Sequence, residues 1–312
     1  SSLMSAFYET QNEFLTGVYK RYGSIETANI IIYFARNTHL QIIRQREKDL
    51  NFDISLNNFW DNFQNTTIQS EKVSSVVVFT GIPKETVRRK VKKLLKLGYL
   101  LNDKNTKGYI WTLSSKYKNL YQKAVDDEIR IFSNFIFKIA KCLGLQMNIE
   151  LVEKKIKSQF SFYWYHFLSC QLQFLKMWQL KLKDNDLLLI VLQAVIPTLQ
   201  YAEKIKKDTR IDNIFQIIGK IDSQYNFSKT SVSASAVSEI TGIPRATCIR
   251  KLDKLRHLGF LTREQNTKRY LINQNMTERT KNILTKENVS STVDCFSGYL
   301  AIILNSLLSP KG

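Results

Sequence analysis

Apolar and basic side chains share residues 84–96 at the spacing of a two-faced helix. Val87, Val91 and Leu94 fall on one side of such a helix, and Lys and Arg occupy much of the remainder. Clustered Lys and Arg bind phosphates and gain affinity for polyanions by releasing counterions. The first chemistry that this sequence predicts is therefore binding of an anionic polymer along one helix.

The positive charge is concentrated in two segments of the chain. The whole sequence carries 46 Lys and Arg against 27 Asp and Glu, a formal charge of +19. Residues 72–118 hold 12 basic and 2 acidic residues, or +10, and residues 229–269 hold 9 and 3, or +6. A generally basic surface would spread its charge, so the map favours two local binding surfaces for nucleic acid over an anionic membrane.

These two segments belong to an internal repeat. TGIPKETVRRKVKKLLKLGYLLNDKNTKGYIWT (80–112) and TGIPRATCIRKLDKLRHLGFLTREQNTKRYLIN (241–273) align without a gap, with 16 of 33 positions identical. We therefore expect two similar halves, 1–150 and 151–312, with the boundary near 144–158. Apolar stripes over 129–143 and 293–307 predict a long helix after each copy, and we consider both ordinary core packing and packing of the two stripes together.

Local signals predict the elements within each copy. In the first, Gly81 permits a tight turn after a short apolar helix, Pro83 suits a helix start, and Gly98 suits a left-handed helix end. Alternating residues on either side of a polar turn at 102–107 predict a β-hairpin. The order is helix, tight turn, helix, hairpin.

The fragment TGIPKETVRRKVKKLLKLGYL resembles the core of bacterial transcriptional regulators of the IclR and MarR families. The resemblance implies winged helix-turn-helix motifs at about 68–114 and 229–275, or roughly 30% of the chain. The expected fold is mainly α with small β-hairpin wings: two tandem motifs embedded in helical bundles, related by a pseudo-two-fold internal repeat. The implied function is sequence-specific binding of double-stranded DNA, with two recognition helices per chain acting as a pseudo-dimer.

The resemblance places the second helix in the major groove and the hairpin near the flanking backbone. In the first copy we expect DNA contacts from Lys84, Glu85, Thr86, Arg88, Arg89, Lys92, Lys93, Lys104 and Lys107. In the second copy we expect them from Arg245, Thr247, Ile249, Arg250, Lys251, Lys254, Asn266, Lys268 and Arg269. Arg suits bidentate contact with guanine, and Glu accepts from cytosine.

Some aligned positions of the second helix carry the same residue in both copies, and others carry residues of different chemistry. Arg89 matches Arg250 and Lys90 matches Lys251, so we expect these four to hold phosphate. Glu85 and Arg88 face Ala246 and Ile249 in the alignment, so the presumed reading faces differ. We therefore expect an imperfectly palindromic operator.

Other classes of function have little support in the sequence. A phosphate-binding Gly-rich loop, a G-x-S-x-G elbow and an HExxH motif are absent, so we expect no enzyme activity. Three His and four scattered Cys predict no metal site and no cofactor. The chain begins without a signal-peptide pattern, and its most apolar stretch, 187–201, is short for a membrane span. We therefore expect a cytoplasmic protein without membrane association.

Several alternatives stay open. A plasmid or phage replication initiator also carries two winged helices in one basic chain, and a chromosome-organising or scaffold protein would use them to dock proteins. An aromatic cluster at 160–178 is either simple core or a pocket for a small-molecule effector. Further self-association of the chain, the operator, the regulated genes and the choice between activation and repression stay open as well.

Overall fold

The computed structural model describes residues 2–66, 68–206, 229–273, 275–277, 280 and 286–308. The described part is mainly helical with two small antiparallel hairpins, which confirms the predicted class. The first half contains α1 (Ser2–Tyr22), α2 (Ile25–Lys48), α3 (Phe59–Asn65), α4 (Val73–Thr80), α5 (Lys84–Lys96), β1 (Leu100–Asp103), β2 (Gly108–Trp111) and α6 (Ser115–Cys142). The second contains α7 (Ile149–Ser158), α8 (Phe160–Leu182), α9 (Asn185–Lys206), α12 (Ala234–Thr241), α13 (Arg245–His257), β3 (Leu261–Arg263), β4 (Tyr270–Ile272) and α15 (Lys286–Leu308).

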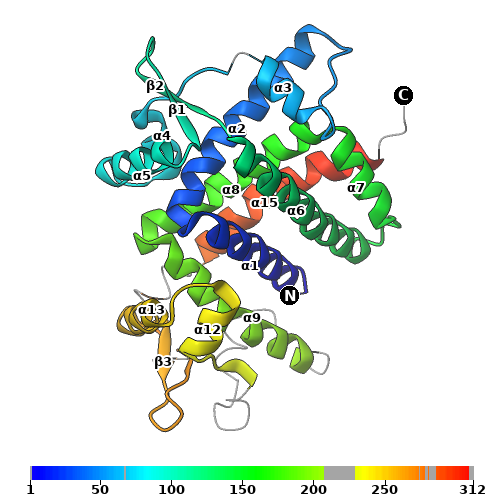
Figure 1. Ribbon diagram of the computed structural model, residues 1–312. Helices are drawn as coiled ribbons and strands as arrows, with labels where there is room; N and C mark the ends of the chain where they lie inside the picture. Colours follow the sequence, from blue (N-terminus) through cyan, green and yellow to red (C-terminus); the bar gives the residue numbers. More distant parts are fainter. Residues whose placement is uncertain are drawn as a thin grey trace. The chain divides into compact units, whose positions relative to one another are not determined.

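The compact units of the chain differ from the halves 1–150 and 151–312 of the repeat. One unit contains Ser1–Ile25 and Asp184–Val289, and the other contains Glu26–Lys183 and Ser290–Gly312. The expected boundary at 150 falls inside α7, whose first turn is capped by the Asn148 side chain. The physical reason is an exchange of helices: α1 packs on α9 and α12, whereas α8 packs on α4 (Figure 1).

The two exchanged helices are themselves related by the repeat. Phe7, Gln11, Phe14 and Leu15 of α1 correspond, at an offset of 160, to identical residues of α8. These counterparts are Phe167, Gln171, Phe174 and Leu175, and the side chains in both sets are buried. Each half therefore begins with the same helix, and that helix packs against the helix–turn–helix segment of the other half.

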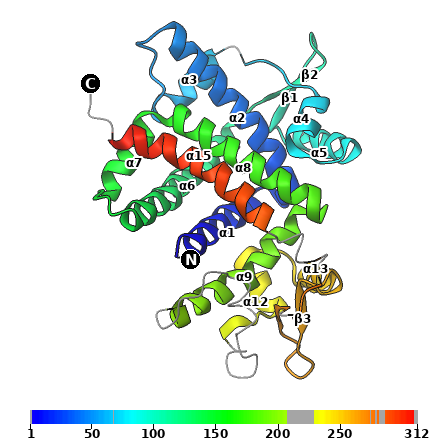
Figure 2. The same cartoon turned by 180° about the vertical axis from the view of Figure 1, so that it is seen from behind.

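Aromatic packing fills the unit that contains α8. Phe160, Tyr163, Trp164, Phe167, Phe174 and Trp178 are buried. From α15, Tyr299 lies 5.2 Å from Phe132 of α6 between ring centroids, and Phe296 lies 6.0 Å from Phe174 (Figure 2). Phe132 of the first apolar stripe therefore lies against α15, whereas Leu143, at the end of that stripe, is exposed.

Short-range geometry agrees with the residues that the sequence singles out. Gly81 and Gly242 adopt φ of 69° and 75° and end α4 and α12, so both turns need a left-handed residue. Pro83 and Pro244 are the N-cap residues, directly before α5 and α13 begin. Among the described helices, none combines the length and the hydropathy that crossing a bilayer requires.

Candidate nucleic-acid interface

Helix α5 has one buried and one basic face. Val87, Val91 and Leu94 are at most 1% exposed, which fixes the rotation of the helix about its axis. That rotation turns the basic side chains outward, and Lys84, Arg88, Arg89, Lys92 and Lys93 are all exposed. The apolar spacing in the sequence thus determines where the charge lies.

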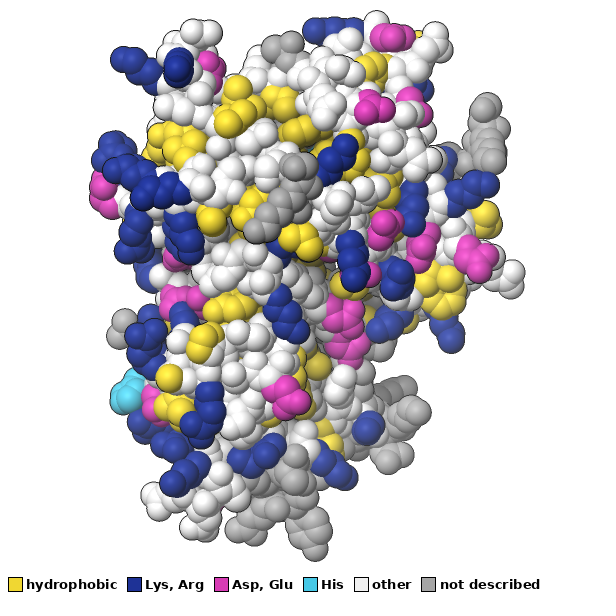
Figure 3. Space-filling view, in the orientation of Figure 1, with side chains coloured by type: hydrophobic (Ala, Val, Ile, Leu, Met, Phe, Trp, Pro, Cys, Tyr) yellow, Lys and Arg dark blue, Asp and Glu magenta, His cyan; other side chains and the backbone are white. Residues whose placement is uncertain are grey.

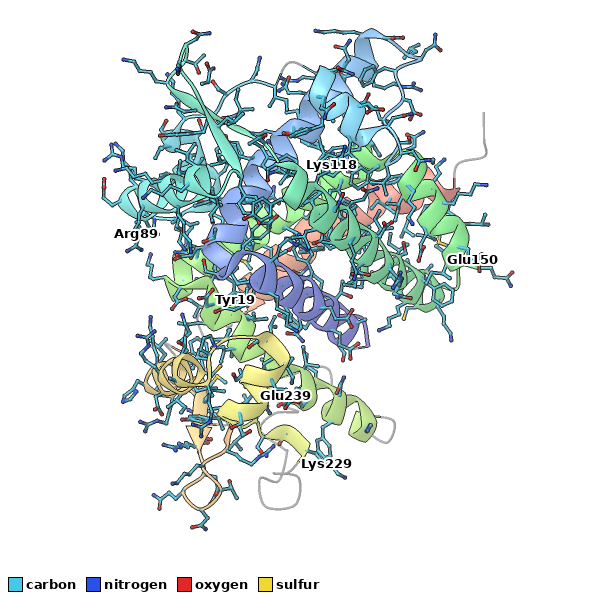
Figure 4. All side chains as sticks on the ribbon, in the orientation of Figure 1. Tyr19, Arg89, Lys118, Glu150, Lys229 and Glu239 are labelled. Carbon is cyan, nitrogen blue, oxygen red and sulfur yellow. The ribbon has the colours of Figure 1, made fainter. Side chains whose placement is uncertain are left out.

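An open groove of about 1050 Å³ runs between this basic face, the start of α4 and the hairpin β1–β2. Eight of its thirteen lining residues within the described chain are Lys or Arg. Figure 3 shows these basic side chains gathered over α5, and Figure 4 shows Arg89 directed away from the helical body. The lining consists of Lys72, Val73, Ser74, Lys84, Glu85, Arg88, Arg89, Lys92, Lys93, Lys96, Thr106, Lys107 and Tyr109.

Glu85 is the acidic residue of that lining, and it is paired. Its Oε1 lies 2.5 Å from Arg88 Nη1, one helical turn away. Both side chains are at least half exposed, so the pair adds little to stability. It does orient the Arg88 guanidinium and reduces the repulsion that Glu85 would exert on a phosphate.

The hairpin turn at the edge of the groove is built in the same way in both copies. The Asp103 carboxylate accepts from the Thr106 hydroxyl and the Asn105 N–H, and these hydrogen bonds lower its pKa. Glu264 accepts from the N–H and hydroxyl of Thr267, which likewise lowers its pKa. In each copy the turn ends with a lysine at positive φ.

Lys107 and Lys268 have φ of 54° and 56°, a left-handed conformation that costs a residue with a side chain about 1 kcal/mol. Both lysines are exposed at the hairpin tip, beside Lys104 and Asn266 respectively. The carboxylate-centred turn holds this strained backbone in both copies. The geometry thus projects a cation from each hairpin.

A buried polar network supports the groove wall formed by Tyr109. Glu71 exchanges two backbone hydrogen bonds with Tyr109, of 2.8 and 2.9 Å. It thereby forms an antiparallel β-bridge along the outer edge of β2. The Glu71 carboxylate accepts from the Tyr33 hydroxyl at 2.6 Å and from the Asn37 amide at 2.8 Å. Burial and this hydrogen bond raise the pKa of Tyr33. Helix α2 thereby fixes the position of the groove wall.

The second copy presents a smaller set of exposed cations. Arg245, Arg250 and Lys254 of α13 are exposed, whereas Thr247 and Ile249 are half-buried. Arg245 Nε donates to Ser235 Oγ at 3.0 Å. The corresponding positions in the first copy are Lys84, Arg89 and Lys93, with Thr86 half-buried.

Arg269 is engaged inside the second copy. Its guanidinium donates to the Ser231 hydroxyl and carbonyl, at 2.8 and 2.7 Å, which braces the hairpin against the strand-like segment before α12. Its side chain is half-buried in this position. This geometry gives Arg269 a bracing role in addition to the expected backbone contact.

The expectation that Lys90 and Lys251 hold phosphate is not met by their positions. Lys251 is buried, and its Nζ lies 2.6 Å from Asp184 Oδ2 and 3.5 Å from Asp186 Oδ2. Lys90 Nζ lies 3.3 Å from Glu26 Oε2 and donates to Thr27 Oγ1. Each lysine faces inward and pairs with acidic residues at the beginning of a long helix. Their identity in both copies reflects a shared internal ion pair.

Lys251→Met should therefore lower the free energy of unfolding and leave the salt dependence of DNA binding unchanged. It leaves Asp184 and Asp186 without their cation at a partly buried site, and we expect a loss of about 1–3 kcal/mol. Lys254→Met, on the exposed face of α13, is the matched control. It should leave the free energy of unfolding unchanged and reduce the salt dependence of DNA binding. Chemical denaturation and a salt titration measure the two effects, and a reduced salt slope for Lys251→Met would contradict this assignment.

Six groove residues were not among the expected contacts: Lys72, Val73, Ser74, Lys96, Thr106 and Tyr109. Lys96 continues the helical spacing of Lys92 and Lys93, so the periodicity alone could have found it. Lys72 and Tyr109 reach the groove through the pairing of Glu71 with Tyr109, a contact across 38 residues. The residues next to Lys72 and Tyr109 in the sequence do not predict this pairing.

The described residues hold no group of three or more potential metal ligands. Cys248 lies on the buried face of α13, and burial raises the pKa of its thiol. No protein-family model, curated protein or solved structure matches the chain.

Proposed function

We propose that this protein is a DNA-binding transcriptional regulator with two winged helix-turn-helix motifs. In this proposal α4, α5 and β1–β2 form one motif, and α12, α13 and β3–β4 form the other. The carrying observation is the groove beside α5, where eight basic side chains converge from a helix, its neighbour and a hairpin tip. The likeness of TGIPKETVRRKVKKLLKLGYL to IclR and MarR regulators favours the same function.

The shape of the basic surface supports a duplex as the ligand. The major groove of B-DNA is about 12 Å wide and admits one α-helix with its exposed side chains. Helix α5 offers such a face, because its apolar side is covered and its other side is open. Lys107 projects from the hairpin next to that face, where the flanking phosphates of a bound duplex would lie. The cations along α5 supply affinity by releasing counterions.

The two motifs offer different chemistry for reading bases. In α5 the early exposed positions are Glu85 and Arg88, which suit cytosine and guanine respectively. In α13 the matching positions are the exposed Ala246 and the half-buried Ile249, whose apolar groups suit contact with the thymine methyl. We therefore propose that one chain binds two unlike half-sites, which dimeric regulators space by about 34 Å.

Selection of bound duplexes from a random pool tests this proposal. The full chain should recover a site with two dissimilar half-sites, one rich in G·C pairs and one rich in A·T pairs. Glu85→Ala should relax selection in the first half-site and leave the second unchanged, and Ile249→Ala should do the reverse. A perfect palindrome bound by one chain would contradict the unlike half-sites, and failure to bind duplexes at low salt would favour a scaffold that docks proteins.

A further inference from the structure

A lysine covers the turn glycine in each of the two helix–turn–helix segments. A Cβ on Gly242 would lie 3.2 Å from Cγ and 3.5 Å from Cε of Lys20. A Cβ on Gly81 would lie 3.3 Å from Cγ of Lys176. The lysine stems therefore rest against the backbone of the turns, where the lack of a side chain lets them approach.

These lysines come from the exchanged helices. Lys20 lies on α1 and covers the turn before α13, within one unit; Lys176 lies on α8 and covers the turn before α5, within the other. At the repeat offset of 160, the counterpart of Lys20 is Leu180, whose Cδ2 would lie 3.5 Å from a Cβ on Gly81. The two helices thus deliver a lysine to the same place from positions one helical turn apart.

The turn is close to the phosphate-binding part of such a motif. Only two residues separate Gly81 from Lys84 at the beginning of α5, and the same number separates Gly242 from Arg245. The beginning of a helix carries partial positive charge and unpaired N–H groups that favour an anion. A lysine stem packed on the glycine extends that positive region onto the neighbouring helix, since its ammonium lies one bond beyond Cε.

We propose that Lys20 and Lys176 each bind a backbone phosphate of the duplex, so that the leading helix of one half completes the DNA-binding surface of the other half. The proposal rests on the proposed function of the two motifs. In each motif the recognition helix, α5 or α13, and its hairpin form the DNA-binding surface. The proposal adds one lysine to each surface, from α1 or from α8. It also assigns a role in DNA binding to the helix exchange.

Lys20→Met and Lys176→Met test the proposal, because methionine keeps much of the stem on the glycine and removes the charge. Each should lower the slope of log K against log salt by about 0.9 and weaken binding about eightfold at about 0.1 M salt. The double variant should show the sum, and Lys20→Arg and Lys176→Arg should retain the wild-type slope. Fluorescence anisotropy on a labelled random-sequence duplex measures these values, and the melting temperature should stay unchanged.

Lys204→Met on α9 and Lys154→Met on α7 are matched controls, one in each unit, because both lysines are exposed outside the helix–turn–helix segments. They should leave the slope at the wild-type value. Wild-type binding with equal slopes in the controls and in Lys20→Met and Lys176→Met overturns this inference alone. Absence of duplex binding by the wild-type chain overturns the proposed function and this inference together.

Discussion

Alanine at Arg89, Lys92 and Lys93 should weaken binding of duplex DNA by about 10²- to 10³-fold at about 0.1 M salt. All three side chains are exposed and line the groove beside α5. Each lost phosphate contact removes about 0.9 from the slope of log K against log salt, so the triple variant should lose nearly three units of slope. Anisotropy titrations at several salt concentrations measure both quantities.

A charge-matched variant separates this effect from net charge. Lys123, Lys141 and Lys154 are exposed on α6 and α7 of the same unit, and the lining of the α5 groove includes none of them. Replacing these three with alanine changes the net charge equally and should change affinity by less than about threefold, through long-range electrostatics that salt screens. Equal losses in both triple variants would show that the groove has no special role.

Acidification from pH 7 to pH 4.5 should lower the free energy of unfolding by about 2–3 kcal/mol through His39 alone. This imidazole is fully buried, stacked on Phe59 at 4.9 Å and edge-on to Phe160 at 5.1 Å. Its Nδ1 lies 3.2 Å from Ser161 Oγ, and its Nε2 has no hydrogen-bond partner among the described residues. Burial without a counter-ion lowers the pKa of His39 to about 3.

The sign follows from where each state binds the proton. The unfolded chain binds it near the ordinary pKa of 6.5, whereas the folded chain does so only near pH 3. The contribution of neutral His39 to the free energy of unfolding is therefore complete above about pH 6.5. It is lost progressively as the pH falls to about 3. Urea denaturation of wild type and His39→Gln at both pH values measures it. The variant should lack this component of about 2–3 kcal/mol, and parallel pH profiles of wild type and variant would contradict the buried neutral imidazole.

The helix–turn–helix–hairpin segments were predictable because their determinants are local. Gly81 and Gly98 need positive φ, Pro83 suits a helix start, and the spacing of Val87 and Val91 fixes the buried face. The exposed positions of Lys84, Arg88 and Arg89 follow from that spacing. One helix thus contains most of the information for its own basic surface.

The roles of Lys90 and Lys251 were misread because repetition has two physical origins. A lysine shared by two copies serves equally well for a common ligand or for a common internal ion pair. The deciding partners lie more than 60 residues away in sequence, Glu26 on α2 and Asp184 directly before α9. Only the packing of α2 and α9 shows that the shared lysine forms an internal ion pair.

The helix exchange was also beyond prediction. The apolar side of α1, with Phe14 and Leu15, fits any complementary apolar surface, and its periodicity does not name one. The matching residues of α8 could have been found by a search at an offset of 160, which would have extended the repeat. That search still would not have told which half each helix packs against.

The exchange of α1 and α8 constrains how such a chain arises in evolution. A gene for one half alone would encode a helix–turn–helix segment whose covering helix had to come from a second molecule, as in a helix-swapped homodimer. Fusion of two such genes makes both partners part of one polypeptide, always present in equal amounts. The two copies are then free to diverge, as Glu85 and Ala246 have, without mixed dimers forming between variants.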